Sequence, residues 1–159
     1  MGDPNVVDLV TLMFNCHHFG FKGVDRAQMN RALFCALKSG GIHVLADHAG
    51  RPGTGISESG TLHRIEEAFL RREVEAAGFK LAGEGLFLRN PSDPRGKNTP
   101  NPPQPKDEFA LKFVKPRVRQ AQSDSSGIGE GRCRSPRQRC GSPHSVAVTV
   151  AVTVTAVWV

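Results

Sequence analysis

The sequence lacks several features that would assign it to a class at once. No stretch reaches the roughly 18 apolar residues that a membrane-spanning helix needs. Its first residues, 1–5, show neither a basic cluster nor an apolar run, so no signal peptide is predicted and the compartment stays unknown. The net charge of +6 is concentrated in residues 117–159, which carry six arginines against two acidic residues. We therefore expect neither a membrane partner nor a specific nucleic-acid partner for the body of the chain.

Residues 6–47 alternate between apolar runs and a helical pattern. Val6–Phe14 is almost entirely apolar, which predicts a central strand covered on both faces. Asp25 is a predicted helix N-cap with Gln28 at the capping-box position, and the helix that follows has one apolar face. Gly40 is expected to end this helix before a second buried strand, Ile42–Asp47. The unit predicts an α/β fold in which the two strands are parallel.

The pattern continues after a loop rich in glycine and serine. A second helix is predicted from Glu58 or Leu62 to Ala77. Residues 79–88 indicate one strand interrupted by two glycines, or two short strands, and residues 109–114 alternate as a half-buried strand.

The composition changes abruptly after Pro116. Residues 117–143 contain almost no large apolar side chain, which predicts disorder. Residues 145–159 alternate valine with alanine or threonine, a pattern typical of aggregation-prone strands. We therefore expect one domain over residues 1–116 and a disordered, low-complexity tail over 117–159, for which out-of-frame translation is one explanation.

Three segments carry a resemblance to a known family. Arg31–Gly41 resembles the R-x-L-K-P-G-G helix end of class I S-adenosylmethionine-dependent methyltransferases, Ile42–Asp47 resembles their fifth strand, and Glu75–Phe79 resembles the E-A-G-F turn before their sixth. Asp47–Gly55 is similar to a bacterial group labelled "predicted methyltransferase". The resemblance covers about residues 3–116. It implies the carboxyl-terminal half of a Rossmann-like sheet, with parallel strands and a final antiparallel hairpin, and S-adenosyl-L-methionine as cofactor with a small-molecule or protein methyl acceptor.

The sequence shows no counterpart of the family's first strand or of its G-x-G-x-G turn, which hold the methionine and ribose of the cofactor. Gly50–Gly60 follows a late strand and does not read G-x-G-x-x-G before a helix, so it does not replace them. No cofactor-binding residue is assigned, and we expect a truncated fragment with impaired catalysis. The sheet face that missing strands would cover is expected to promote self-association.

Polar residues follow both predicted parallel strands, where α/β sheets place their chemistry. Asn15 could hydrogen-bond the nucleophile or the cofactor, and His17 could be the catalytic base because imidazole titrates near neutral pH. Asp47 ends the second predicted strand and could contact the substrate, while His48 and Arg51 lie where a substrate would enter, and Arg51 could pair with an anionic substrate. Structural interpretations stay open: Asn15 could cap the loop, Asp47 could bond a backbone turn, and Arg51 could be solvated.

Histidine is plentiful, yet its spacing is unlike that of a reliable metal site. His17, His18, His48 and His63 could meet Asp47 where two strand ends converge, but none has i,i+4 or Cys-x-x-Cys spacing. No metal ligand is predicted. The family resemblance leads us to expect an aspartate where His18 stands. The cysteines fit no zinc-finger spacing.

Two functional alternatives stay open beside the methyltransferase fragment. One is a non-catalytic remnant or interaction module, and the other is a fragment of a different Rossmann-like oxidoreductase. The Gly-Phe turn followed by two late strands favours the methyltransferase.

Overall fold

The computed structural model describes residues 6–98 and 105–117 of the chain. The chain divides into two units, Met1–Val118 and Arg119–Val159, and the described residues all belong to the first. The predictions for the tail therefore lie almost wholly outside the described residues. Within the described ranges, no helix has the length and apolar character needed to cross a membrane.

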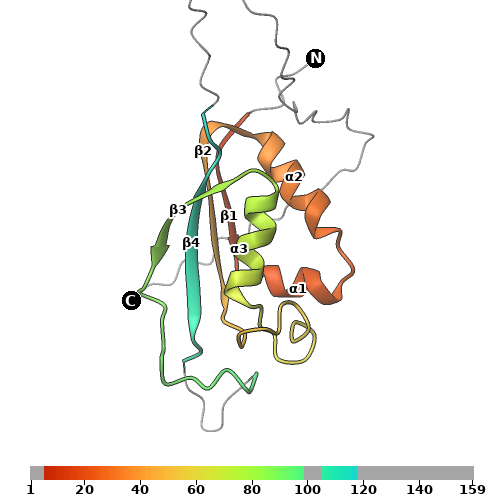
Figure 1. Ribbon diagram of the computed structural model, residues 1–159, viewed down its shortest axis with the longest axis vertical. Coiled ribbons are helices and arrows are strands. Elements are labelled where there is room, and N and C mark those ends of the chain that lie inside the picture. Colours follow the sequence, from red (N-terminus) through yellow and green to blue (C-terminus); the bar gives the residue numbers. More distant parts are fainter. Residues whose placement is uncertain (1–5, 99–104, 118–159) are drawn as a thin grey trace, which may run out of the picture. The chain divides into compact units, whose positions relative to one another are not determined.

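Four strands and three helices make up the described fold, which is a mixed α/β sheet (Figure 1). In chain order they are β1 (Val7–Met13), α1 (Cys16–Phe21), α2 (Arg26–Ala36), β2 (Leu37–His48), α3 (Glu67–Ala76), β3 (Lys80–Gly85) and β4 (Glu108–Val114). The strand order is β1-β2-β4-β3. The predicted parallel pair is confirmed as β1 and β2, and β4 runs antiparallel to both β2 and β3.

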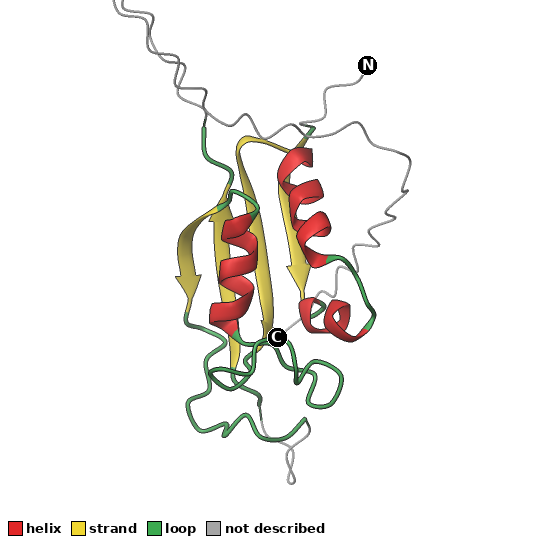
Figure 2. Cartoon of the chain, turned by 45° about the vertical axis from the view of Figure 1, so that its right-hand side comes forward, coloured by secondary structure: helices red, strands yellow, loops and turns green. Residues whose placement is uncertain are grey.

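The helices α2 and α3 lie side by side against one face of the sheet (Figure 2). The buried core fills the space between them and the strands, with Leu37, Leu45, Ile65, Leu70, Val74, Phe79, Phe109, Leu111 and Phe113 as its largest apolar side chains. The prediction that the first strand is covered on both faces is wrong for the described residues. Leu9 is 53% exposed, and Val6 and Met13 are exposed as well, because no described helix covers the opposite face.

The helix α2 begins as predicted, since the Gln28 backbone N–H donates to Asp25 Oδ1 over 2.8 Å. Its end differs from the prediction. The backbone turns extended at Leu37, whose buried side chain starts β2 directly, so Gly40 lies within the strand. Gly40 has φ of 82°, a conformation that glycine adopts without a Cβ clash, and a bulge there shifts the β1–β2 register.

Two other predicted boundaries are corrected. The helix α3 starts at Glu67, later than predicted, because the preceding residues pair with the end of β2: Ile65 N–H donates to the His48 carbonyl over 3.1 Å. The strand β3 runs through Gly83 as one element, although its register with β4 shifts between Leu81 and Gly83, and Leu86 and Phe87 are exposed beyond it. The short helix α1 has no counterpart in the prediction.

The strand β1 is an edge of the described sheet, with β2 as its one described neighbour. An exposed apolar edge offers unpaired backbone groups to a second chain. We expect the protein to self-associate at high concentration and Leu9→Lys to move it toward the monomer, as measured by size-exclusion chromatography with light scattering. The control, Ala32→Lys on the exposed side of α2, adds the same charge away from the edge. Wild-type protein that stays monomeric at every concentration would contradict this expectation.

Candidate functional site

The candidate site lies at the carboxyl ends of β1 and β2. The backbone N–H of Phe14 donates to the Ala46 carbonyl over 2.7 Å and keeps the two strand ends together. The helix α1 starts directly after β1, and the segment before α3 pairs with Ala49 just beyond β2. Three segments that are distant in the sequence therefore meet at one end of the sheet.

The Asp47 carboxylate is at the centre of this site and has no exposed surface. Its Oδ2 accepts the backbone N–H of His17 over 2.9 Å, and its Oδ1 accepts the backbone N–H of His48 over 2.8 Å. Oδ1 also lies 2.5 Å from Nδ1 of the His17 ring. Because an ionised carboxylate can only accept hydrogen bonds, Nδ1 is the nitrogen that donates to it, and in the neutral form of the ring the proton-free nitrogen is Nε2. Asp47 therefore positions His17 and presents no surface to a substrate.

The His17 ring is buried among other imidazoles. Its centroid lies 4.2 Å from that of His18 and 5.5 Å from those of His48 and His63. His63, which comes from the segment before α3, was not among the predicted catalytic or substrate-binding residues. Its backbone has φ of 53°, an uncommon conformation for a residue with a side chain.

His48 is half-buried beside His17. Burial, helped by the positive charge of Lys106, lowers the pKa of His48 to about 4, so this ring is neutral at physiological pH. Its Nδ1 lies 2.8 Å from Glu108 Oε1, although the two atoms are not aligned for a hydrogen bond. Burial raises the pKa of Glu108. A neutral ring and a carboxyl that retains its proton more readily suit a site of low polarity.

The other two predicted residues lie at the rim and are engaged locally. Asn15 is exposed, and its side-chain amide donates to the Met13 carbonyl over 2.8 Å. Arg51 is exposed and donates through Nε to Glu58 Oε1 over 2.9 Å. The structure thus brings His17, Asp47 and His48 together, while Asn15 and Arg51 have partners of their own.

A buried ion pair that the sequence analysis missed holds the loops around the site. The guanidinium of Arg64 donates to Asp93 Oδ2 over 2.8 Å and to the Ala49 carbonyl over 2.9 Å. Asp93 Oδ2 also accepts the backbone N–H of Asp107 over 2.7 Å. The pair joins the segment after β2, the loop after β3 and the start of β4, and no local sequence pattern indicates it.

The electrostatics of this pair favour its charged form. Burial raises the pKa of Asp93, but hydrogen bonds from the backbone of Asp107 and Arg95 and from Arg64 outweigh it and hold the pKa below its ordinary value. The carboxylate of Asp93 therefore stays ionised, and Arg64, the residue after His63, is held in place.

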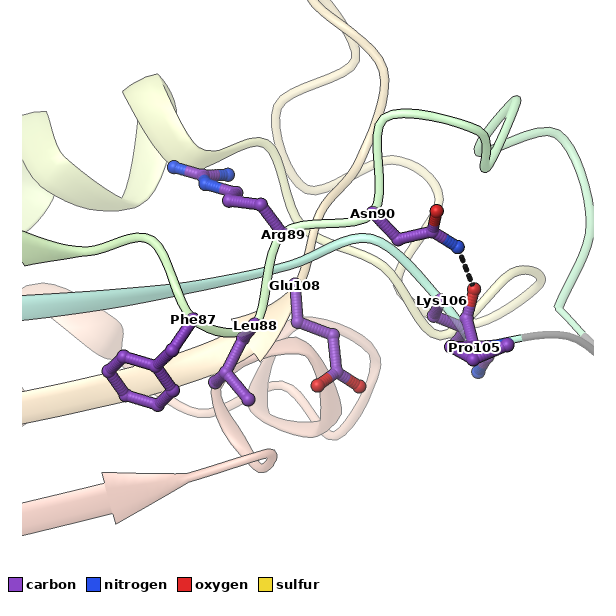
Figure 3. A pocket seen from close by; sticks show the side chains of 7 residues that line it. All are labelled: Phe87, Leu88, Arg89, Asn90, Pro105, Lys106 and Glu108. Atoms are coloured by element: carbon purple, nitrogen blue, oxygen red, sulfur yellow. Dashed lines mark hydrogen bonds between the residues drawn. The ribbon is translucent and has the colours of Figure 1, made fainter.

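A hollow of about 260 Å³ lies between the segment after β3 and the start of β4 (Figure 3). It is lined by Phe87, Leu88, Arg89, Asn90, Pro105, Lys106 and Glu108. Arg89 and Glu108 point in opposite directions in this view, and Arg89 pairs with Glu67. Glu108 also approaches His48, so it connects the hollow with the histidines.

No protein-family model matches the chain, and no curated protein matches its sequence. Among solved structures, the [4+2]-cyclase SpnF aligns with a TM-score of 0.50 at 14% identity, over 74% of this chain and 53% of that one. An S-adenosylmethionine-dependent methyltransferase from Mesorhizobium loti aligns with a TM-score of 0.44 at 16% identity, over 72% and 63%. A chain from the Haloferax volcanii complex of the Trm112 methyltransferase activator with a candidate methyltransferase aligns with a TM-score of 0.47 at 17% identity, over 74% and 57%.

These comparisons bear on the fold alone. The likeness to the cyclase shows that the described sheet and helices have the arrangement of a larger α/β protein. The chain spans between 53% and 63% of the length of the three solved structures that it matches.

The Arg64–Asp93 pair provides a test of how this end of the sheet is held. We expect Arg64→Met to lower the free energy of unfolding by about 3–5 kcal/mol, because it leaves a buried carboxylate without its partner. The measurement is urea unfolding followed by circular dichroism. Arg71→Met is the control, since Arg71 pairs with Glu75 on the solvent side of α3 and its loss should cost less than about 1 kcal/mol. Equal losses for the two variants would contradict the assignment.

Proposed function

We propose that this chain carries the acceptor side of an S-adenosylmethionine-dependent methyltransferase, acting on a small-molecule or protein acceptor that loses a proton. The observation that carries the proposal is the Asp47–His17 pair at the ends of two parallel strands, with a 2.5 Å contact between Oδ1 and Nδ1. The sequence resemblance over Arg31–Gly41 and Glu75–Phe79 supports it, because it associates this order of elements with methyl transfer.

The chemistry asks for alignment and for a proton acceptor. S-adenosylmethionine supplies a methyl group on a sulfonium, which needs no further activation. The unprotonated Nε2 of His17 can take the proton of an acceptor hydroxyl or amine, and the buried Asp47 stabilises the charge that the imidazole then gains. Asp47 is thus a positioning residue, in place of the substrate contact expected from the sequence.

The described residues fit the acceptor side of such a site. His48 is neutral and contributes a ring beside His17 without a competing charge. Asn15 and Arg51 stay in the proposal as rim groups for the acceptor, and Arg51 would have to leave Glu58 to bind an anion.

The cofactor side differs, because no described segment has a G-x-G-x-G turn between a strand and a helix. The Gly-rich segment between β2 and α3, Gly50–Gly60, has a different spacing. The resemblance assigns the methionine and ribose of the cofactor to such a turn. We infer from this that the chain alone binds S-adenosylmethionine weakly and that its catalysis is impaired, as expected for a fragment of the family's fold.

Amide chemical shifts in a ¹⁵N-labelled sample test the proposal. We expect millimolar S-adenosylmethionine to shift the backbone amides of residues 14–18 and 47–51, because the cofactor would lie at the carboxyl ends of β1 and β2. NAD⁺ is the matched control, because it also contains an adenosine but lacks the sulfonium-bearing methionine.

Each outcome separates the candidate functions. Shifts with S-adenosylmethionine at these amides, and none with NAD⁺, support the methyltransferase. The reverse pattern favours the oxidoreductase, and the absence of shifts with either ligand favours a non-catalytic module. Either of the last two results would overturn the proposal.

A further inference from the structure

We propose that His17, His18 and His63 bind a divalent transition-metal cation, with zinc as the best match. One ring nitrogen from each of the three lies within 4.8 Å of the others. His17 is buried, while His18 and His63 are half-buried, so solvent reaches the cluster from one side. Imidazole nitrogen is a preferred ligand of zinc, and three such ligands with one open position are typical of reactive zinc sites.

The arrangement of the rings favours convergence on one point. The centroids of His18 and His63 are 5.5 Å apart, as are those of His17 and His63, and both pairs are close to perpendicular. A tetrahedral zinc with bonds of 2.0–2.1 Å needs its ligand nitrogens about 3.3 Å apart. The nitrogens lie up to 4.8 Å apart in this structure, so binding requires the half-buried rings of His18 and His63 to turn toward His17.

The contact between His17 and Asp47 resembles the carboxylate–histidine contact that orients many metal-binding histidines. Histidines that bind metals usually donate their second ring N–H to a carboxylate, which fixes the tautomer and increases the basicity of the free nitrogen. In this chain, Nδ1 of His17 lies 2.5 Å from Asp47 Oδ1, which leaves Nε2 for the cation. The buried negative charge of Asp47 also offsets part of the charge that the cation brings.

The backbone holds His63 in place although its conformation is unfavourable. Its φ of 53° is uncommon for a residue with a side chain, and such strain often marks functional positions. The next two residues are firmly held: Arg64 is buried and donates to the Ala49 carbonyl, and Ile65 N–H donates to the His48 carbonyl. The hydrogen bonds of Arg64 and Ile65 therefore hold the His63 ring near the ends of β1 and β2, independently of any contact between the imidazole rings.

The open position suggests how the cation would act. It can take an oxygen, nitrogen or sulfur of the methyl acceptor and lower the pKa of the bound group. With Nε2 of His17 as a ligand, the acceptor's proton, made more acidic by the cation, would pass to water at the half-buried side of the cluster and not to a free imidazole. This role rests on the proposed function, whereas binding of the cation does not.

Isothermal titration calorimetry of the full chain with Zn²⁺ near neutral pH tests the site. We expect His63→Asn and His18→Gln each to lower the Zn²⁺ affinity at least tenfold. Asparagine is chosen at position 63 because it tolerates a positive φ. The control is His48→Gln, which removes a ring beside His17 that is outside the proposed triad and should leave the affinity unchanged.

Ring-nitrogen spectra locate the cation directly. On addition of Zn²⁺, the imidazole ¹⁵N resonances of His17, His18 and His63 should shift, and those of the buried core residue His43 should not. Absence of Zn²⁺ binding, wild-type affinity in both triad variants, or unshifted rings would overturn the site. Because the cofactor titration is done without metal, failure of the methyltransferase proposal can be told apart from failure of the metal site.

Discussion

The candidate site depends on the contacts of the Asp47 carboxylate, which join the start of α1 to the end of β2 and orient the His17 ring. The carboxylate accepts the backbone N–H of His17 in the first turn of α1 and that of His48 at the end of β2, and it holds the His17 ring by Nδ1. Backbone donors buried without a partner are costly, so this one side chain stabilises both strand ends as it orients the imidazole. Whether Nε2 meets an acceptor or a cation, the same contact leaves that nitrogen available.

A second set of interactions fixes the loops against this centre. The buried Arg64–Asp93 pair joins segments that follow β2 and β3, and it keeps His63 beside the first two histidines. The edge of the sheet at β1 is less well covered, because β1 has one described neighbour and an exposed apolar face.

Much of the fold could be predicted from local patterns, and the errors share a physical cause. The Asp25 cap and the two parallel strands depend on nearby residues and are confirmed. The start of α3 and the end of α2 are set by tertiary contacts: Ile65 pairs with β2, and the buried Leu37 begins that strand. Such contacts override helix propensity and leave no local signal.

The candidate site also combines residues that the local sequence indicates with contacts that only the folded chain creates. His17 and Asp47 could be selected because each lies at the carboxyl end of a predicted strand, but their pairing depends on the register between β1 and β2. His63 was among the histidines that the sequence allowed to meet at the strand ends, but its spacing did not indicate a metal ligand, because its position depends on a turn held by Arg64. The measurement that tests this account most directly is long-range ¹H–¹⁵N NMR of the His17 ring. The account predicts a proton on Nδ1 and none on Nε2, and loss of this single tautomer in Asp47→Asn. A proton on Nε2, or a mixture of tautomers in the wild-type protein, would contradict it.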